Sequence, residues 1–229
     1  MKRMILIFAL FGGILQLVIG QDATFNRYKN RIGMNVGYGG GFKTVEMAKL
    51  TDGTTSSISF GGGVIFNLEY GREFNRHFDL ALNAGGLFGQ LDKSISNGSV
   101  SFSRTNLSLT PSFMLPLGSS DKIRLKIGAG IDWLYGTQLS IDLSKLTGGI
   151  KDDWKYDNTI GEHLSLILEM NLRKRLSFNA GLNLYNAQYK FKSGDKYEPT
   201  SSELKTPNGS GAGFILGLCY NFNWKKSKS

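Results

Sequence analysis

Residues Ser57–Gly71 read SISFGGGVIFNLEYG, and their side chains alternate in character with a period of two. One parity is dominated by large apolar residues: Ile58, Phe60, Val64, Phe66, Leu68 and Tyr70. The other parity carries mostly small or polar residues: Ser57, Ser59, Gly61, Gly63, Asn67 and Glu69. Because successive side chains of a β-strand point to opposite faces, this alternation predicts one strand with an apolar and a polar face.

The same alternation recurs along the rest of the chain. The further stretches cover residues 32–38, 78–88, 106–117, 123–135, 163–172, 176–184 and 213–224. None of them has the period of about 3.6 residues that marks an amphipathic helix. We therefore predict an all-β fold of eight antiparallel strands. Pro111 lacks a backbone N–H and lies inside the fourth stretch, so we expect a bulge, a missing ladder bond or two short strands there.

Short and long connections between these strands alternate without a break. The short ones are Arg72–His77, Gly118–Lys122 and Arg173–Arg175. The long ones are Lys43–Ser56, Leu91–Ser101, Gly136–Asn158 and Lys190–Ser210. This order is typical of an up-and-down transmembrane β-barrel with periplasmic turns, extracellular loops and both termini in the periplasm. With few apolar residues, Lys190–Ser210 is expected to be mobile.

An eight-stranded soluble barrel with an apolar interior would also alternate, so the two faces must be told apart. The polar faces contain mainly Gly, Ser, Asn and Thr, which suit a narrow interior, whereas a surface in water would need more charge. The apolar faces are long enough for a tilted membrane strand. We therefore expect the apolar parity to face lipid. After the first twenty residues there is no run of eighteen apolar residues that could form a transmembrane helix.

Aromatic residues fall near the strand ends, where amphipathic rings would lie at headgroup depth. At the periplasmic rim we expect Tyr70, Phe78, Tyr220, Phe222 and Trp224. At the outer rim we expect Tyr38, Phe60, Phe88, Trp133 and Tyr135.

The two ends of the chain carry export features. Residues 1–20 resemble a cleaved signal peptide, with Lys2 and Arg3 before an apolar segment and Gln21 as the expected new N-terminus. We expect residues 21–31 to be a periplasmic segment, residues 32–224 the barrel and residues 225–229 a basic periplasmic tail. Removing the signal lowers the formal net charge from +9 to +7. Cys219 is the only cysteine, so no internal disulfide can form.

Together, the export signal, the eight alternating strands, the Gly-rich faces and the final strand Cys219–Trp224 resemble the small outer-membrane β-barrel proteins of Gram-negative bacteria. That superfamily includes the OmpA-like, OmpX-like and porin-family barrel domains. The resemblance implies insertion into the outer membrane by the barrel assembly machinery, which reads an aromatic last strand. Residues 225–229 extend past the usual terminal aromatic, so Trp224 or Phe222 must serve instead. Such barrels include structural proteins, adhesins, secretion-system accessories, narrow porins and lipid-modifying enzymes.

Several charged residues share the polar parity near the periplasmic end of the strands: Glu69, Asp79, Arg124, Lys126 and Glu169. Ions in so narrow a space need partners, so we expect a lumenal charge network that locks and closes the barrel. A gated pore or proton path is the alternative interpretation. A weaker hypothesis concerns His163 and Ser165, which are spaced as a base and a nucleophile on one strand face. Their spacing is similar to the His-x-Ser of outer-membrane lipid A deacylases, but their parity points them into the lumen.

The sequence thus favours a non-enzymatic outer-membrane barrel with a structural or interaction role. Its expected partners are membrane lipid, lipopolysaccharide phosphate and an envelope or secretion-system protein that contacts the long loops. A narrow porin and a lipid A hydrolase using His163 and Ser165 are the alternatives. His77 and His163 are far apart in the sequence, and we expect neither a metal nor a cofactor. No stripe of basic and aromatic residues indicates a nucleic acid partner.

Overall fold

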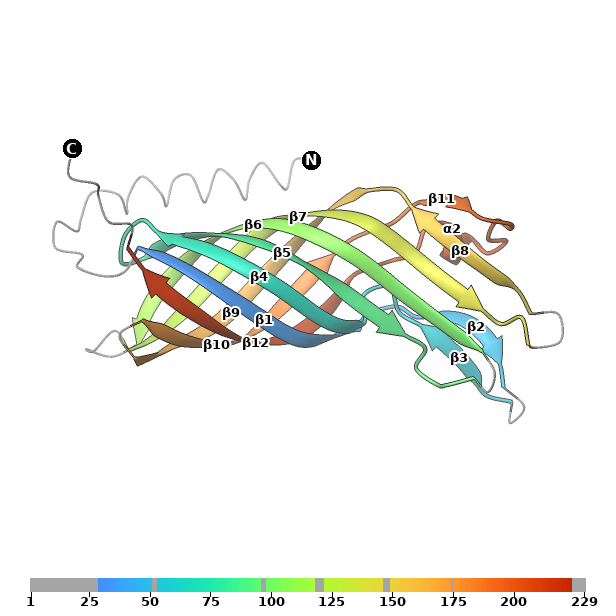
Figure 1. The fold of residues 1–229 in the computed structure, drawn as a ribbon, viewed down its shortest axis with the longest axis horizontal. Helices are drawn as coiled ribbons and strands as arrows, with labels where there is room; N and C mark the ends of the chain where they lie inside the picture. Colours follow the sequence, from blue (N-terminus) through green and yellow to red (C-terminus); the bar gives the residue numbers. More distant parts are fainter. Residues whose placement is uncertain are drawn as a thin grey trace.

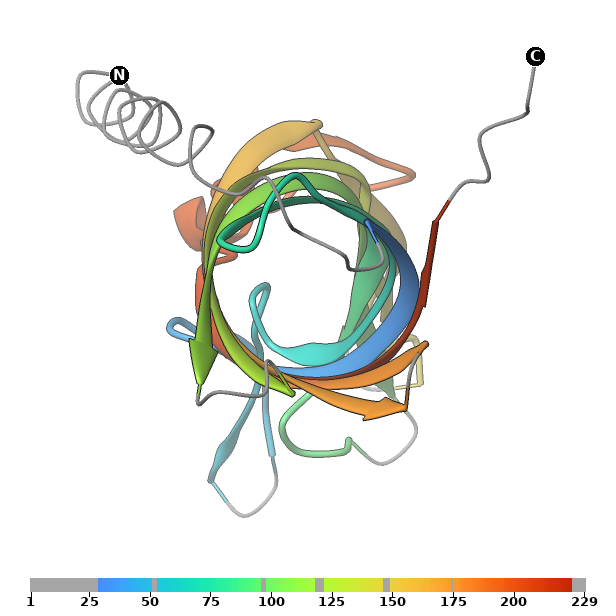
Figure 2. The ribbon, with the colours of Figure 1, turned by 90° about the vertical axis from the view of Figure 1, so that its left-hand side faces the viewer.

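A computed structural model describes residues 29–50, 53–95, 98–117, 122–145, 149–173 and 175–223. The expected signal peptide, Trp224 and the basic tail lie outside these residues. Eight long strands form one closed antiparallel barrel (Figures 1 and 2): β1 (Asn30–Gly41), β4 (Gly63–Glu73), β5 (Phe78–Gln90), β6 (Ser99–Leu117), β7 (Ile123–Asp142), β9 (Thr159–Arg173), β10 (Leu176–Asn186) and β12 (Gly211–Phe222). Each pairs with its neighbour along the chain, and β1 pairs with β12 to close the wall. The predicted eight-stranded barrel is confirmed.

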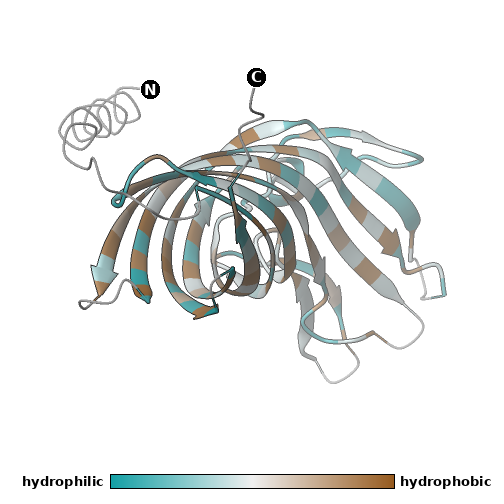
Figure 3. Cartoon of the chain, turned by 60° about the vertical axis from the view of Figure 1, so that its left-hand side comes forward, coloured by the Kyte–Doolittle hydropathy of each residue, from teal (hydrophilic) through white to brown (hydrophobic). Residues whose placement is uncertain are grey.

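The two faces of the wall are distributed as the alternation predicts. Outward-facing Ile32, Leu68 and Leu164 each expose more than half of their surface, at 56%, 54% and 57%. Inward-facing Asn35 and Ser165 are buried. Figure 3 shows the resulting bands of apolar and polar residues along the strands. The prediction that the apolar parity faces outward is confirmed. Within the described part of the chain, no helix is both long and apolar enough to span a membrane.

We call the end of the barrel with the short turns the turn end, or lower end, and the opposite end the upper end. Beyond the aromatic pair Trp133 and Tyr135, the wall continues toward the upper end, and there apolar side chains point inward and polar side chains point outward. The inward residues Val100, Phe102 and Leu139 are buried and apolar. A bulge permits this exchange on β7, where Gly136 adopts φ +61° and the β6–β7 register shifts between Ser103 and Thr105. An L-residue with a side chain rarely adopts that backbone conformation, so the position favours glycine. The upper part of the barrel therefore has an apolar interior, like a soluble protein.

An apolar cap fills this upper interior. It is the cluster of buried residues around Phe60, whose ring centroid lies 4.7 Å from that of Phe102, 5.6 Å from that of Tyr156 and 6.4 Å from that of Tyr189. Its other members include Ile58, Val100, Leu139, Ile141 and Trp154. These side chains come from the barrel wall and from the long connections, so the connections close the barrel mouth.

The stretch Ser57–Gly71 is not one strand, which corrects the sequence prediction. Its first part belongs to β3 (Thr55–Ile58), which pairs with β2 (Val45–Lys49) in a separate hairpin. The chain then turns through Gly61–Gly63, and Gly63 has φ +144° and packs against the β5 backbone. Because of this turn, Phe60 points into the cap with 1% of its surface exposed. The prediction that Phe60 belongs to the outer aromatic girdle is wrong.

Two of the predicted long loops are ordered extensions of the sheet. Much of Gly136–Asn158 is a hairpin in which β7 pairs with β8 (Lys151–Tyr156). Lys190–Ser210 contains β11 (Phe191–Gly194), which pairs with β8, and the short helix α2 (Ser202–Lys205). The expectation that Lys190–Ser210 is mobile is wrong, because the segment packs Phe191 and Leu204 against the cap.

Asp152 fastens this last segment to β8. Its carboxylate accepts hydrogen bonds from the backbone N–H groups of Asp195, Lys196 and Tyr197 at 2.7–3.1 Å and from the Trp154 indole at 2.9 Å. Burial disfavours the charged form of this carboxylate. The Tyr197 and Trp154 donors outweigh that effect and hold the pKa of Asp152 below its ordinary value.

Pro111 leaves a gap in the hydrogen-bond ladder between β6 and β7 but does not split strand β6 in two. Strand β6 runs unbroken from Ser99 to Leu117, and Pro111 pairs with Leu80 on β5. Toward β7, pairing stops at Leu109–Ile131 and resumes in the same register at Ser112–Gly128. The sequence leaves open a bulge, a missing ladder bond or two short strands at Pro111. The structure has the missing ladder pairs.

Candidate functional site

Near the turn end of the barrel, seven ionisable side chains meet in the lumen and form what we call the charge layer: Arg31, Glu69, Glu73, Asp79, Arg124, Lys126 and Glu169. They project inward from β1, β4, β5, β7 and β9, because each has the inward parity of its strand. None exposes more than 6% of its surface. The layer therefore lies in the path that any solute would take through the barrel.

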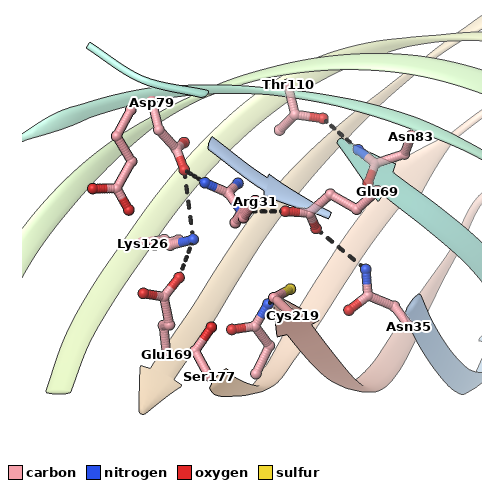
Figure 4. Close-up of polar contacts among 12 residues, drawn as sticks. Arg31, Asn35, Glu69, Asp79, Asn83, Thr110, Lys126, Glu169, Ser177 and Cys219 are labelled. Carbon is pink, nitrogen blue, oxygen red and sulfur yellow. Dashed lines mark hydrogen bonds and ion pairs between the residues drawn. The ribbon is translucent and has the colours of Figure 1, made fainter. Parts of the chain in front are cut away.

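Shared partners connect the charge layer into one network, and Figure 4 shows the part that runs from Glu69 through Arg31, Asp79 and Lys126 to Glu169. Arg31 donates to Glu69 at 2.5 Å and also to Asp79, which lies 3.5 Å from the Lys126 ammonium. Lys126 pairs in turn with Glu169.

Arg124 adds Glu73 of β4 to the network. It pairs with Glu169, and its Nη2 lies 2.6 Å from Glu73 Oε1. Because the ion pairs link strands on different sides of the lumen, they fix the cross-section of the barrel and occupy its centre. Removing one member of such a buried pair costs about 3–5 kcal/mol, since the other charge stays buried without compensation.

The structure brings together all five charged residues that the sequence analysis selected and adds Arg31 and Glu73. The sequence analysis places Arg31 in a periplasmic segment, whereas β1 begins at Asn30. It places Glu73 in a turn, whereas β4 extends to this residue. Extending the two alternation patterns by two residues would have found both, because Arg31 shares the parity of Asn35, and Glu73 that of Glu69.

Above the charge layer, the lumen holds a polar chamber of about 100 Å³. Its lining is rich in amides and hydroxyls: Asn35, Asn67, Asn83, Asn106, Ser108, Thr110, Ser112, Asn179 and Asn183. A water molecule needs about 10–15 Å³ of such space and two to four polar partners, so the chamber can hold several waters. The charge layer bounds it on one side and the apolar cap on the other.

His163 lies in the wall of this chamber. Its Nδ1 is 3.0 Å from Asp132, and its Nε2 is 3.0 Å from the Thr110 hydroxyl. Ser165 is buried on the same face of β9. Both residues of the hydrolase hypothesis thus point into the lumen, as their parity indicates. Sequence reasoning missed Asp132 because its proximity to His163 depends on the β7–β9 register, which aligns Asp132 with Gly161.

Polar contacts tie the cap to the barrel wall. The Arg104 guanidinium donates to the Tyr189 hydroxyl at 2.6 Å and lies over the Tyr185 ring, 5.4 Å from its centroid. Burial raises the pKa of the Tyr189 phenol. Tyr185 donates its own hydroxyl to the Gly61 carbonyl, which holds the turn that leads into β4. The cap is therefore anchored to β6 and β10, and it forms a second barrier in the lumen.

Several aromatic residues of the two predicted girdles lie near the ends of the membrane part of the wall. At the turn end, Tyr70 and Tyr220 are partly exposed, Phe78 is half-buried, and the rings of Tyr220 and Phe222 stack with centroids 6.3 Å apart. At the other rim, the Trp133 and Tyr135 centroids are 5.1 Å apart.

Among the residues described, no group of three or more His, Cys, Asp or Glu side chains could hold a metal ion. Cys219 is a buried free thiol against Gly33 of the wall.

No protein-family model matches the chain, and no curated protein matches its sequence. Solved structures do match. The outer membrane protein OprG from Pseudomonas aeruginosa is 14% identical and superimposes with a TM-score of 0.60, covering 89% of this chain and all of OprG. Neisserial surface protein A is 12% identical with a TM-score of 0.49, covering 84% of this chain and 97% of that one. The outer membrane protein W of E. coli is 14% identical with a TM-score of 0.46, covering 86% and 100%. The superposition on OprG shows that this chain has the fold of a small eight-stranded outer-membrane β-barrel.

Proposed function

We propose that this protein is an integral outer-membrane barrel that neither conducts solutes nor catalyses a reaction, and that it acts as a structural or interaction component of the envelope. The observation that carries the proposal is the double obstruction of its lumen. The charge layer fills the turn end, and the apolar cap fills the opposite end. A diffusion pore would need both to be absent.

The outward surface supports the membrane location. A continuous belt of apolar side chains surrounds the middle of the wall, with half or more of Met34, Val64 and Leu218 exposed. In water such a belt would be a large apolar patch of the kind that soluble monomers avoid. In a bilayer it is matched to hydrocarbon, and the aromatic rims lie at headgroup depth.

The upper half of the molecule is the proposed contact surface. Its outward residues, such as Gln138, Ser140 and Lys155, are polar, and the segments that carry them are fixed by β-pairing and by Asp152. A pre-ordered surface loses little conformational entropy on binding. We propose that it contacts lipopolysaccharide or another envelope protein from the extracellular side.

Conductance in planar bilayers tests the proposal. The variant Arg124→Ala/Glu169→Ala opens the charge layer while removing one charge of each sign, and Phe60→Ala/Phe102→Ala opens the cap. We expect no channel steps from the wild type or from either variant, because one barrier remains in each. The combined four-site variant should conduct. Channel steps from the wild type would favour the narrow porin, and a silent four-site variant would contradict the two-barrier model.

The hydrolase alternative is tested separately. Overexpression of the wild type should leave lipid A unchanged in mass spectra, because His163 and Ser165 face the lumen rather than the bilayer. Loss of an acyl chain with the wild type, but not with His163→Ala, would overturn the non-enzymatic assignment.

A further inference from the structure

The exposed charge of the molecule is divided unevenly between its two ends. At the turn end, the described residues that are exposed and charged are all cations, and we call them the basic rim: Lys29, Arg72, Lys122, Arg173 and Arg175. Glu73 is also at this end, but it is buried in the charge layer. Lys174 and Asp121 lie in the same turns of the sequence, outside the described residues, and their charges cancel.

The opposite end is nearly neutral despite its many lysines. Its described lysines are Lys43, Lys49, Lys93, Lys145, Lys151, Lys155, Lys190, Lys192, Lys196 and Lys205. Its described carboxylates are Glu46, Asp92, Asp142, Asp152, Asp153, Asp157, Glu162, Asp195, Glu198 and Glu203. Some of these lysines and carboxylates form ion pairs; for example, Lys151 Nζ lies 2.7 Å from Asp142 Oδ2. The basic character of the protein therefore resides at the turn end.

The basic rim follows one continuous arc of the barrel. Its residues lie at the ends of β1, β4, β7 and β9 and in the turn before β10. Around the wall, the order β4, β1, β12, β10, β9 and β7 is unbroken. Five cations along this arc create a positive field that is larger than any single residue would give.

Aromatic rings place part of the basic rim at the membrane surface. The Arg72 guanidinium carbon is 5.9 Å from the centroid of the Phe74 ring. The Arg175 Nη1 donates to the Tyr220 hydroxyl at 2.9 Å. Phe74 and Tyr220 are exposed on the outside of the wall at its lower edge. The guanidinium groups are thus held where lipid phosphates would lie, beside rings that anchor in the headgroup region.

We propose that the basic rim binds the phosphate groups of anionic glycerophospholipids in the leaflet at the turn end, and so orients the barrel in the membrane. This inference rests on the proposed membrane insertion. Arginine suits the ligand because its planar fork can donate two hydrogen bonds to one phosphodiester. A basic residue near an anionic bilayer contributes about fivefold to binding, so three arginines contribute on the order of a hundredfold.

The test uses the full chain folded in neutral detergent micelles and titrated with phosphatidylglycerol or phosphatidylcholine, with bound lipid counted by native mass spectrometry. The rim variant is Arg72→Gln/Arg173→Gln/Arg175→Gln. The matched control, Lys151→Gln/Lys155→Gln/Lys192→Gln, removes three cations from the other end. We expect the rim variant to bind phosphatidylglycerol ten- to a hundredfold more weakly, while phosphatidylcholine binding and the control variant stay unchanged.

Two further measurements use the wild type alone, so they test the proposal even if the rim variant does not fold. Raising NaCl from 50 to 500 mM should weaken phosphatidylglycerol binding at least tenfold, because salt screens exposed charges. Millimolar inorganic phosphate should not displace the lipid, and displacement would show a free-phosphate site instead. Equal affinity for the two lipids, or salt-independent binding, would overturn the proposal. Failure of the wild type to insert into phosphatidylcholine vesicles would instead refute the membrane assignment on which it rests.

Discussion

Replacing Arg124 with methionine should destabilise the barrel because it leaves the buried carboxylate of Glu73 without an ion-pair partner. Arg124 contacts both Glu73 and Glu169, but Glu169 also pairs with Lys126. Among the described residues, Arg124 is the only ion-pair partner of Glu73, and Glu73 Oε2 accepts no hydrogen bond. Methionine keeps much of the arginine volume, so packing changes little. The variant therefore leaves Glu73 as a buried and uncompensated charge, which costs about 3–5 kcal/mol.

A second substitution separates this local effect from the net charge of the lumen. Arg124→Met/Glu73→Gln restores the original net charge and removes the carboxylate that lost its partner. Arg124→Met/Glu69→Gln restores the same net charge but removes a carboxylate that pairs with Arg31. We expect the first double variant to recover most of the loss, to within about 2 kcal/mol of the wild type. The second should recover nothing.

Unfolding by urea in phosphatidylcholine vesicles, followed by tryptophan fluorescence, measures these differences. Electrophoretic mobility with and without heating confirms that each variant starts from a folded barrel. Equal recovery by both double variants would show that net charge, rather than pairing, sets the stability. A cost below about 1 kcal/mol for Arg124→Met alone would refute the uncompensated-charge reasoning altogether.

Three further predictions concern the cap, the wall and the upper loops. Phe60→Ala should destabilise the cap by about 3–5 kcal/mol and speed hydrogen exchange at Tyr189, while the lower strands keep their protection. Pro111→Ala adds a backbone N–H at a gap in the β6–β7 ladder; we expect unchanged or slightly raised stability in urea, and a clear loss would contradict the gap. The depressed pKa of Asp152 implies that its stabilisation is full above about pH 4 and is lost as pH falls further, so proteolysis near Lys196 should accelerate at pH 3 but not at pH 6.

The period of two predicted the membrane part of the wall because each strand there separates two different environments. Ile32 and Leu68 meet hydrocarbon, and Asn35 and Glu69 meet a narrow polar lumen, so parity alone assigned each side chain to a face. The same parity brought the five selected charges together. Asp132 beside His163 could not be predicted, because parity fixes the face of a residue but not its height relative to a neighbouring strand.

The upper part of the barrel escaped prediction for a different reason. In that part the interior of the barrel is apolar and its outer surface is polar, which is the reverse of the membrane part. On β6 the apolar parity changes between Phe102 and Leu107, which breaks the alternation. On β7 the Gly136 bulge compensates for the exchange, so the apolar parity continues through Leu139 although its direction is reversed. From the sequence alone, the parity change on β6 and the bulge on β7 look the same as the start of an irregular loop. Only the position of the membrane boundary along each strand would distinguish the two cases.

The reversed polarity above Gly136 also constrains how this protein can diverge. Along β8 the outer side chains of Lys151, Asp153 and Lys155 touch water, whereas Trp154 and Tyr156 belong to a shared interior. Changes at the outer positions alter the surface that meets water without disturbing the packing beneath. Variation among descendants of this gene should therefore fall on every second residue of that hairpin, and a length change should be tolerated only at its tip.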